Sequence, residues 1–244
     1  MSKMEINQLI VVTDGKSNIG GNPATVAAEA AKRSIVVNAI GIIGNDGEDD
    51  GALSEIEDIA RAGKGIAQYS TVSNLGYTMH GVTQKTINKT IETIVGKQLK
   101  EMIGGDISDL PPRSRGKIIE YMERLGEETG IKCCVVMDCS GSMFNRMGTA
   151  RQSVIDLFHS LKARNGKSEI AVIAFPGEQG EPCKIISNFT ENIDLIKSRV
   201  LEMKAGGSTP TAAAMNRALQ LMAGEVDTDE VINISEPLLK KSIV

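Results

Sequence analysis

Aromatic residues are scarce in this sequence: tryptophan is absent, and aromatic side chains make up 3% of the 244 residues. A hydrophobic fraction of 41% is still enough for a buried core, which aliphatic side chains and Met must therefore fill. No CxxC pair occurs among the four cysteines, so we expect structural thiols in a reducing compartment. Length and composition together allow one large α/β domain or two small ones.

No cluster of Lys and Arg forms a stripe in the sequence, and the net charge is −4 with a pI near 5.4. This charge argues against nucleic acid or an anionic membrane as the main partner. The longest apolar runs, such as CCVVM and AVIAF, have the length of a strand and are too short to cross a membrane. Because residues 1–8 contain no apolar signal core, we expect a cytoplasmic protein.

The first 70 residues alternate between continuous β-branched runs, typical of strands covered on both faces, and helical patterns. We predict strands at 9–14, 35–43 and 65–70 and helices at 22–33 and 52–63. Asn22 is the expected N-cap of the first helix, and Pro23 lies in its first turn. The β-α-β-α-β order is typical of a doubly wound sheet.

Residues 71–130 change in character, because apolar residues now recur at helical spacing. We predict one long amphipathic helix and, after two prolines, a second helix. The apolar residues expected on their inner faces are Ile87, Ile91, Ile94, Val95, Leu99, Met102 and Ile103 in the first helix, and Ile118, Ile119, Met122 and Leu125 in the second. No ligand-type cluster occurs here, so we interpret this segment as a helical insert that packs or bridges.

From residue 131 the alternation of strands and helices resumes. We predict strands at 131–138, 169–175 and 183–189, the last an edge strand, and helices at 147–165, 192–203 and 209–224. The residues expected to face inward from the first of these helices are Ala150, Val154, Leu157, Phe158 and Leu161. The tail at 225–244 is weakly patterned.

Oxygen-bearing side chains follow two buried strands and begin the last helix. An Asp-x-Ser-x-Ser motif comes directly after the strand at 131–138, a Thr-Asp-Gly motif ends the strand at 9–14, and a GGSTPT stretch precedes the helix. We expect Gly141 to let the first of these loops fold back on itself. Carboxylates and hydroxyls without imidazole or thiolate suit Mg²⁺, Mn²⁺ or Ca²⁺ rather than zinc. The predicted metal ligands are Asp138, Ser140, Ser142, Thr209 and Asp14.

Together these motifs resemble the metal-ion-dependent adhesion site of the von Willebrand factor type A domain, over 1–70 and 131–224. The resemblance implies a six-stranded, mostly parallel α/β sheet of order 3-2-1-4-5-6 with helices on both faces, and a metal above the carboxyl ends of strands 1 and 4. In that family the metal takes an Asp or Glu from a partner protein, and Ser140 and Ser142 would contact the metal directly. The resemblance therefore implies a metal-dependent protein-binding module, not an enzyme.

The order of the motifs departs from the family, in which the Thr-Asp-Gly strand comes last instead of first. We predict a circularly permuted domain, since a chain can be cut in one loop and rejoined at its old ends. The expected segments are the second half of the domain at 1–70, a helical bridge at 71–130, the first half at 131–224 and a tail at 225–244.

The same half-swapped order resembles the YabS-type proteins of spore-forming Firmicutes, which implies a link to sporulation. A site completed within one monomer is the preferred arrangement. The alternative is a domain-swapped dimer, in which residues 1–70 complete the site of a partner chain.

Catalysis is a weaker alternative. The TDGKS stretch lacks the earlier glycine of a phosphate loop because position 10 is Ile, and Ser140 lacks the Gly two positions before it that a serine hydrolase requires. His80 in the insert and His159 in a helix suggest no catalytic pair. A metal-dependent hydrolase and a scaffold with a vestigial metal site therefore stay secondary, and Cys139 is interpreted as a small filler.

A last alternative is a calcium loop in the stretch DGEDDGALSEIE, which has the spacing of an EF-hand. Its candidate ligand positions are Asp46, Glu48, Asp50, Gly51 and Glu57. A strand precedes it instead of a helix, and acidic residues at the start of a helix commonly favour the helix dipole. We therefore prefer a helix start over a calcium site.

Overall fold

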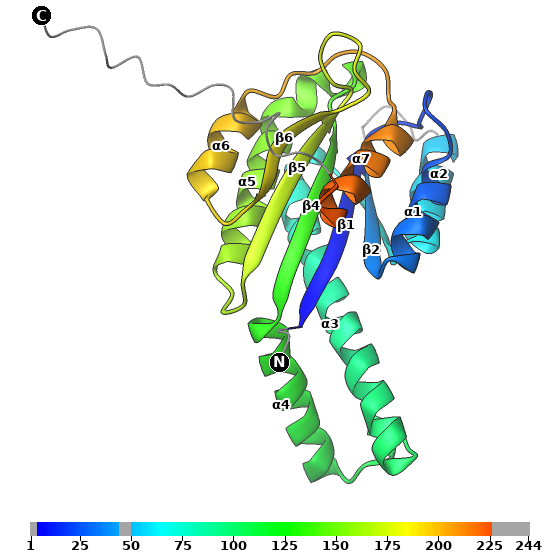
Figure 1. Cartoon of the computed structure of the whole chain (residues 1–244), viewed down its shortest axis with the longest axis vertical. Helices are drawn as coiled ribbons and strands as arrows, with labels where there is room; N and C mark the ends of the chain where they lie inside the picture. Colours follow the sequence, from blue (N-terminus) through cyan, green and yellow to red (C-terminus); the bar gives the residue numbers. More distant parts are fainter. Residues whose placement is uncertain (1–3, 44–49, 226–244) are drawn as a thin grey trace, which may run out of the picture.

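The computed structural model describes residues 4–43 and 50–225, and Figure 1 follows the chain through them. Six strands of these residues form one sheet in the order β3-β2-β1-β4-β5-β6. All neighbouring strands are parallel except β5 and β6, which are antiparallel. The strands are β1 (Glu5–Thr13), β2 (Ile35–Ile42), β3 (Lys64–Ser70), β4 (Gly130–Asp138), β5 (Ser168–Phe175) and β6 (Lys184–Thr190). The predicted α/β fold with a six-stranded, mostly parallel sheet is confirmed, and so is the edge strand β6.

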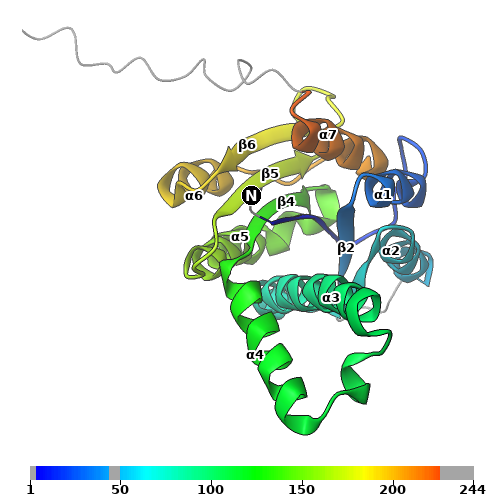
Figure 2. The same cartoon turned by 60° about the horizontal axis from the view of Figure 1, so that its bottom comes forward.

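Helices cover both faces of this sheet, which is why its central strands are apolar without alternation. Figure 2 shows α1 and α7 on one side of the sheet and α3 and α5 on the other. The first face carries α1 (Pro23–Lys32), α2 (Asp50–Ala62) and α7 (Thr211–Ala223), and the second carries α3 (Leu75–Ile103), α5 (Met147–Lys162) and α6 (Ile193–Leu201). The core therefore forms two layers of aliphatic side chains.

The helix boundaries follow from local chemistry. Asn22 caps α1, because its Oδ1 accepts the Ala24 N–H at 2.8 Å, and Pro23 occupies the first turn as predicted. The five side chains predicted to face inward from α5 are all buried. The last helix begins at Thr211 instead of Thr209, and it ends at Gly224, whose φ is 72°.

The helices α3 and α4 (Pro112–Glu128) form a hairpin that extends past the amino end of the sheet (Figure 1). Ile87, Ile91 and Val95 are buried as predicted. The predicted inner positions of Met102 and Ile103 are wrong, because these side chains are 81% and 54% exposed. They lie at the end of α3, beyond the reach of the sheet. Ile119 is also 44% exposed, since it lies beside the inner face that Ile118, Met122 and Leu125 form.

A buried polar cluster joins α3 to the sheet. The Gln8 amide of β1 donates to Thr83 Oγ1 at 3.0 Å and to Cys133 Sγ at 3.2 Å. The Asn38 amide of β2 donates to Thr86 Oγ1 at 3.0 Å and to Gln8 Oε1 at 3.4 Å. These five side chains, which we call the central polar cluster, are at most 3% exposed. Their mutual hydrogen bonds fix the position of α3 on the sheet.

The cysteines form no disulfide within the described part of the chain: Cys133, Cys134 and Cys139 are buried, and Cys183 is partly exposed. Burial raises the pKa of the Cys133 and Cys139 thiols to about 12. Such thiols stay protonated and behave as small core residues. Over residues 4–43 and 50–225, no helix combines the length and hydropathy needed to span a membrane.

Candidate functional site

The carboxyl ends of β1 and β4 lie side by side at the centre of the sheet. The two strands are parallel, and their register pairs Val12 with Met137. The chain then turns toward opposite faces, since α1 lies on one face and α5 on the other. The loops after two such strands diverge, and α/β sheets bind ligands in the crevice between them.

Asp138 ends β4 and is completely buried. Its Oδ2 accepts a hydrogen bond from Thr13 Oγ1 at 2.5 Å, and its Oδ1 accepts the Ser140 N–H at 2.7 Å. Burial raises the pKa of this carboxyl from 3.8 to about 6, although the hydrogen bonds from Ser140 and Thr13 lower it in part. Thus neutral donors hold the Asp138 carboxylate in place, and within residues 4–43 and 50–225 no cationic side chain is ion-paired with it.

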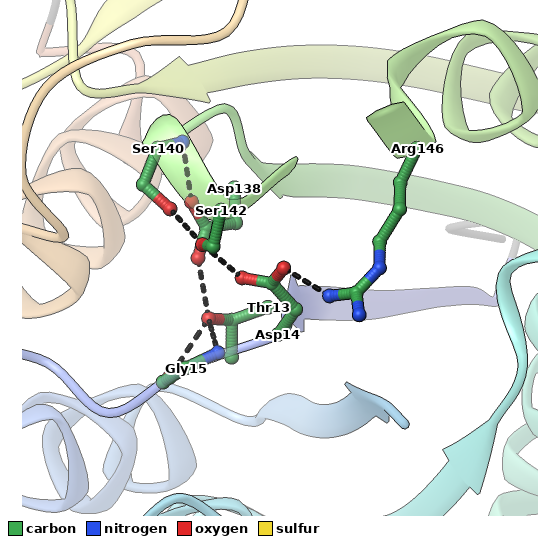
Figure 3. Close-up of polar contacts among 7 residues, drawn as sticks. All are labelled: Thr13, Asp14, Gly15, Asp138, Ser140, Ser142 and Arg146. Atoms are coloured by element: carbon green, nitrogen blue, oxygen red, sulfur yellow. Dashed lines mark hydrogen bonds and ion pairs between the residues drawn. The ribbon is translucent and has the colours of Figure 1, made fainter. Parts of the chain in front are cut away.

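Asp14 and the two serines form a continuous line of oxygen atoms (Figure 3). Ser140 Oγ and Ser142 Oγ are 3.1 Å apart, and Ser142 Oγ donates to Asp14 Oδ1 at 2.6 Å. The other oxygen of Asp14 is ion-paired with Arg146 at the end of the short 3₁₀ helix η3 (Gly141–Arg146). The structure therefore brings together, within one chain, groups that are 128 residues apart in the sequence.

Thr209 lies on a third loop that is tied to the other two. Its N–H donates to Asn18 Oδ1 at 2.9 Å, and its carbonyl accepts the Asn18 N–H at 3.2 Å. On the other side, the Gly141 N–H donates to the Gly207 carbonyl at 3.3 Å. The backbone bonds of the Thr209 loop thus hold it against the loops that carry Asp14 and the two serines.

The glycine that this site needs is not the one expected. Gly141 is absent from the residues with positive φ, and a Cβ added to it would meet only the Gly207 carbonyl at 3.9 Å. Gly207 has a φ of 83°, and a Cβ there would lie 2.9 Å from Pro176 Cγ. The Thr209 loop can therefore lie this close to Pro176 because residue 207 is a glycine.

Comparison with known proteins identifies the family of the chain. Residues 133–235 match the model of the von Willebrand factor type A domain family. The uncharacterized protein YabS of Bacillus subtilis (strain 168) is 34% identical over 220 residues, which are 89% of each chain. The chain belongs to the von Willebrand factor type A domain family. The family inferred from the sequence motifs is thereby confirmed.

Two further proteins are similar to this chain over most or part of its length. The crystal structure of an uncharacterized protein from Alicyclobacillus acidocaldarius subsp. acidocaldarius DSM 446 is 34% identical, with a TM-score of 0.84 over 91% of this chain and 95% of that one. The magnesium-chelatase 67 kDa subunit of Heliobacterium mobile is 31% identical over 103 residues, which are 42% of this chain but 15% of that subunit. The second likeness is thus limited to one segment.

The carboxylate and hydroxyl oxygens at the ends of β1 and β4 fit a hard divalent cation. Neighbouring ligands of octahedral Mg²⁺, with bonds of about 2.1 Å, lie about 3.0 Å apart. The spacings of 3.1 Å between the two serine hydroxyls and 2.6 Å between Ser142 and Asp14 bracket this value. No group of three or more His, Cys, Asp or Glu side chains that could hold a metal occurs within residues 4–43 and 50–225. Any cation here must therefore rely on hydroxyl oxygens together with the two carboxylates.

The remaining candidates lie elsewhere. The ring of His80 on α3 shares a hydrogen bond with the Ser160 hydroxyl on α5, and His159 is exposed. In the EF-hand-like stretch, Asp46 and Glu48 lie outside the described residues, while Glu57 accepts the Tyr69 hydroxyl at 3.3 Å.

Sequence reasoning missed Arg146. Its partner Asp14 is 132 residues away, and no local pattern signals such a pair.

Proposed function

We propose that the protein captures an acidic side chain of a protein partner through a divalent cation, Mg²⁺ in the first place, with Mn²⁺ or Ca²⁺ as substitutes. The cation would be held by Asp14, Asp138, Ser140, Ser142 and Thr209. The observation that carries the proposal is the line of oxygens from Ser140 through Ser142 to Asp14, with the spacings of 3.1 and 2.6 Å. Membership of a family whose domains commonly bind divalent metals supports it.

The side chains of such a site would have different roles. Ser140 and Ser142 supply neutral oxygens and would bind the cation directly, while the buried Asp138 compensates its charge. Three of the five donors are hydroxyls, so little negative charge accumulates around the cation. When bound, the cation supplies a Lewis-acidic position for the carboxylate of a partner.

The surface around the loops supports a protein as the partner. Phe144 follows Ser142 on η3 and is 74% exposed, and Ile19 on the loop after Asp14 is 58% exposed. Large exposed apolar side chains beside a polar centre are typical of protein-binding surfaces.

We also infer that the domain is circularly permuted, with 1–70 as its second half and 131–224 as its first. Three observations support this. The family model matches the chain from residue 133, within β4. The two carboxylate loops follow adjacent parallel strands, and the antiparallel strand β6 lies at the sheet edge beyond β5. In a domain that is not permuted, the chain would begin before β4 and end after β3. The hairpin of α3 and α4 would then be the segment that joins these two former ends.

One observation favours a second function, a scaffold without a metal. Arg146 already pairs with one of the two site carboxylates, so an ion pair could hold the loops together without a cation. The two functions differ in whether Mg²⁺ binds. A non-enzymatic role, a monomeric state, cytoplasmic location and a link to sporulation stay predictions that accompany the first function.

Calorimetric titration with Mg²⁺, together with an affinity pull-down with and without Mg²⁺, tests the proposal. Wild-type protein should bind one cation and retain an acidic-motif partner until a chelator is added, and Asp138→Ala should lose both properties while remaining folded. Asp58→Ala, at an exposed carboxylate paired with Arg61 on α2, is the matched control and should behave as wild type. Absence of saturable Mg²⁺ binding by the wild type would favour the scaffold.

A further inference from the structure

Arg146 is ion-paired with Asp14, one of the two site carboxylates. Its guanidinium Nη1 donates to Asp14 Oδ2, and Ser142 Oγ donates to Asp14 Oδ1. Figure 3 shows the arginine and the serine approaching the Asp14 carboxylate from opposite sides. The guanidinium therefore occupies one oxygen of Asp14 and leaves the serine side of the carboxylate facing the predicted ligands.

This ion pair is shielded from water on the carboxylate side. The Asp14 side chain is fully buried, and the Arg146 side chain is 28% exposed. A charge in such a position is screened less than one on the open surface. It therefore acts on any other charge that enters the site.

The fixed charges of the site are two carboxylates and one guanidinium. Without a cation they leave one negative charge, and with a divalent cation they leave one positive charge. A carboxylate from a partner then brings the site to neutrality. If residue 146 were neutral, the loaded site would already be neutral before any partner arrived, and capture of a carboxylate would leave it negative.

We propose that Arg146 weakens the binding of the cation and strengthens the capture of the partner carboxylate by the loaded site. This role rests on the proposed function. Arg146 is thus a positioning residue whose charge decides which of the two binding steps is tight.

The test compares Arg146→Gln with the wild type in two separate measurements. Mn²⁺ affinity is measured from the free-ion electron paramagnetic resonance signal, and acetate binding to the Mn²⁺-loaded protein is measured from the loss of water-proton relaxation. Arg146→Gln should bind Mn²⁺ about tenfold more tightly, because a repelling charge is removed. The same variant should bind acetate at least about threefold more weakly.

Two further variants control for shape and for charge in general. Arg146→Lys keeps the charge and should stay close to the wild type in both measurements. Arg33→Gln makes the same change of charge at the end of α1, where Arg33 pairs with Glu29, and should change neither.

Opposite shifts of the two affinities are specific to an effect of charge. If Arg146→Gln weakens both bindings, Arg146 only orders the loop, and the proposal is overturned. Unchanged affinities overturn it too, as does unfolding of both Arg146→Gln and Arg146→Met, because the ion pair would then be a requirement of the fold. Asp138→Ala is expected to bind no Mn²⁺. If the wild type also binds no Mn²⁺, it is the proposed function that fails, and not only the role of Arg146.

Discussion

Polar groups on the strands β1 and β4 are buried in two places that differ in charge. The central polar cluster contains amides, hydroxyls and one thiol, and Gln8, Asn38 and Cys133 belong to it. The candidate site at the carboxyl ends of the same strands contains the carboxylates Asp14 and Asp138. The first place is neutral and closed by mutual hydrogen bonds, while the second carries charge and opens to the surface at the exposed Ser142.

The difference separates polar groups that specify a fold from polar groups that are kept for binding. A neutral hydrogen-bonded cluster costs little free energy to bury, and it fixes how α3 lies on the sheet. A buried carboxylate costs more, and the raised pKa of Asp138 is the sign of this cost. Such a cost is expected where a charge serves a ligand.

The largest effect should come from removing that charge. The pKa of Asp138 is 3.8 in its ordinary state and about 6 in the folded protein. The metal-free folded state therefore binds the extra proton between pH 4 and 6, and wild-type stability falls over this window as the pH rises. Asp138→Asn lacks the ionisable group, so its stability should not fall in this way. Its free energy of unfolding, relative to that of the wild type, should therefore be about 3 kcal/mol higher at pH 7 than at pH 4. Urea unfolding in the presence of a chelator at both pH values measures this.

For this first variant the control is the same experiment with Mg²⁺. The cation should raise wild-type stability at pH 7 and leave the variant unchanged. A constant difference between the two proteins from pH 4 to pH 7 would contradict the prediction.

A smaller effect is expected from the central polar cluster. Gln8→Leu removes the hydrogen bonds to Thr83, Cys133 and Asn38 and leaves the Asn38 amide short of an acceptor. The free energy of unfolding should fall by about 2 kcal/mol. Mg²⁺ affinity, measured by calorimetry, should not change, and a parallel loss of Mg²⁺ binding would show that the two polar regions are coupled.

Thr13 lies at the boundary between the two regions and should have an intermediate role. Its hydroxyl donates to Asp138 Oδ2, and it accepts the Gly15 N–H at 3.2 Å. Thr13→Val should lower the free energy of unfolding at pH 7 by about 1 kcal/mol and raise the pKa of Asp138 further, because a hydrogen bond to the ionised form is lost. Thr13→Ser keeps the hydroxyl, so equal urea-unfolding results for the two variants would argue against this role.

The smallest effect belongs to the tip of the hairpin, which neither polar region reaches. Met102→Ser changes a side chain that is 81% exposed. We expect a change in thermal unfolding equivalent to less than about 0.5 kcal/mol and no change in Mg²⁺ affinity. A clear drop in stability would mean that Met102 is covered in solution.

Much of the fold could be predicted from the sequence because its signals are local. Buried runs such as 9–14 and 35–43 identify strands, and Asn22 with Pro23 identifies the start of α1. The neighbouring ends of β1 and β4 could also be predicted, since the family motif places Asp14 beside the Asp138 loop. The structure brings these residues together, whereas their binding of a cation stays a prediction.

The parts that could not be predicted depend on distant partners. The apolar positions predicted for α3 begin at Ile87, although the helix begins at Leu75. Thr83 and Thr86 interrupt the apolar pattern before Ile87, and the amides of the sheet satisfy both hydroxyls. Met102 and Ile103 follow the apolar period, but the period cannot reveal where the sheet ends. Arg146 gave no signal for the same reason, since its partner is supplied by another strand.

The pairing of β1 with β4 has a consequence during synthesis of the chain. Glu5 pairs with Gly130, so one edge of β1 has no neighbouring strand until the ribosome has made a further 125 residues. At ordinary rates of translation this takes on the order of ten seconds. Throughout that time the nascent chain carries an open apolar strand edge, which is a template for aggregation. Thus β1, which leads to Asp14, is the first strand of this sheet to be made, and one of its edges stays open until β4 follows.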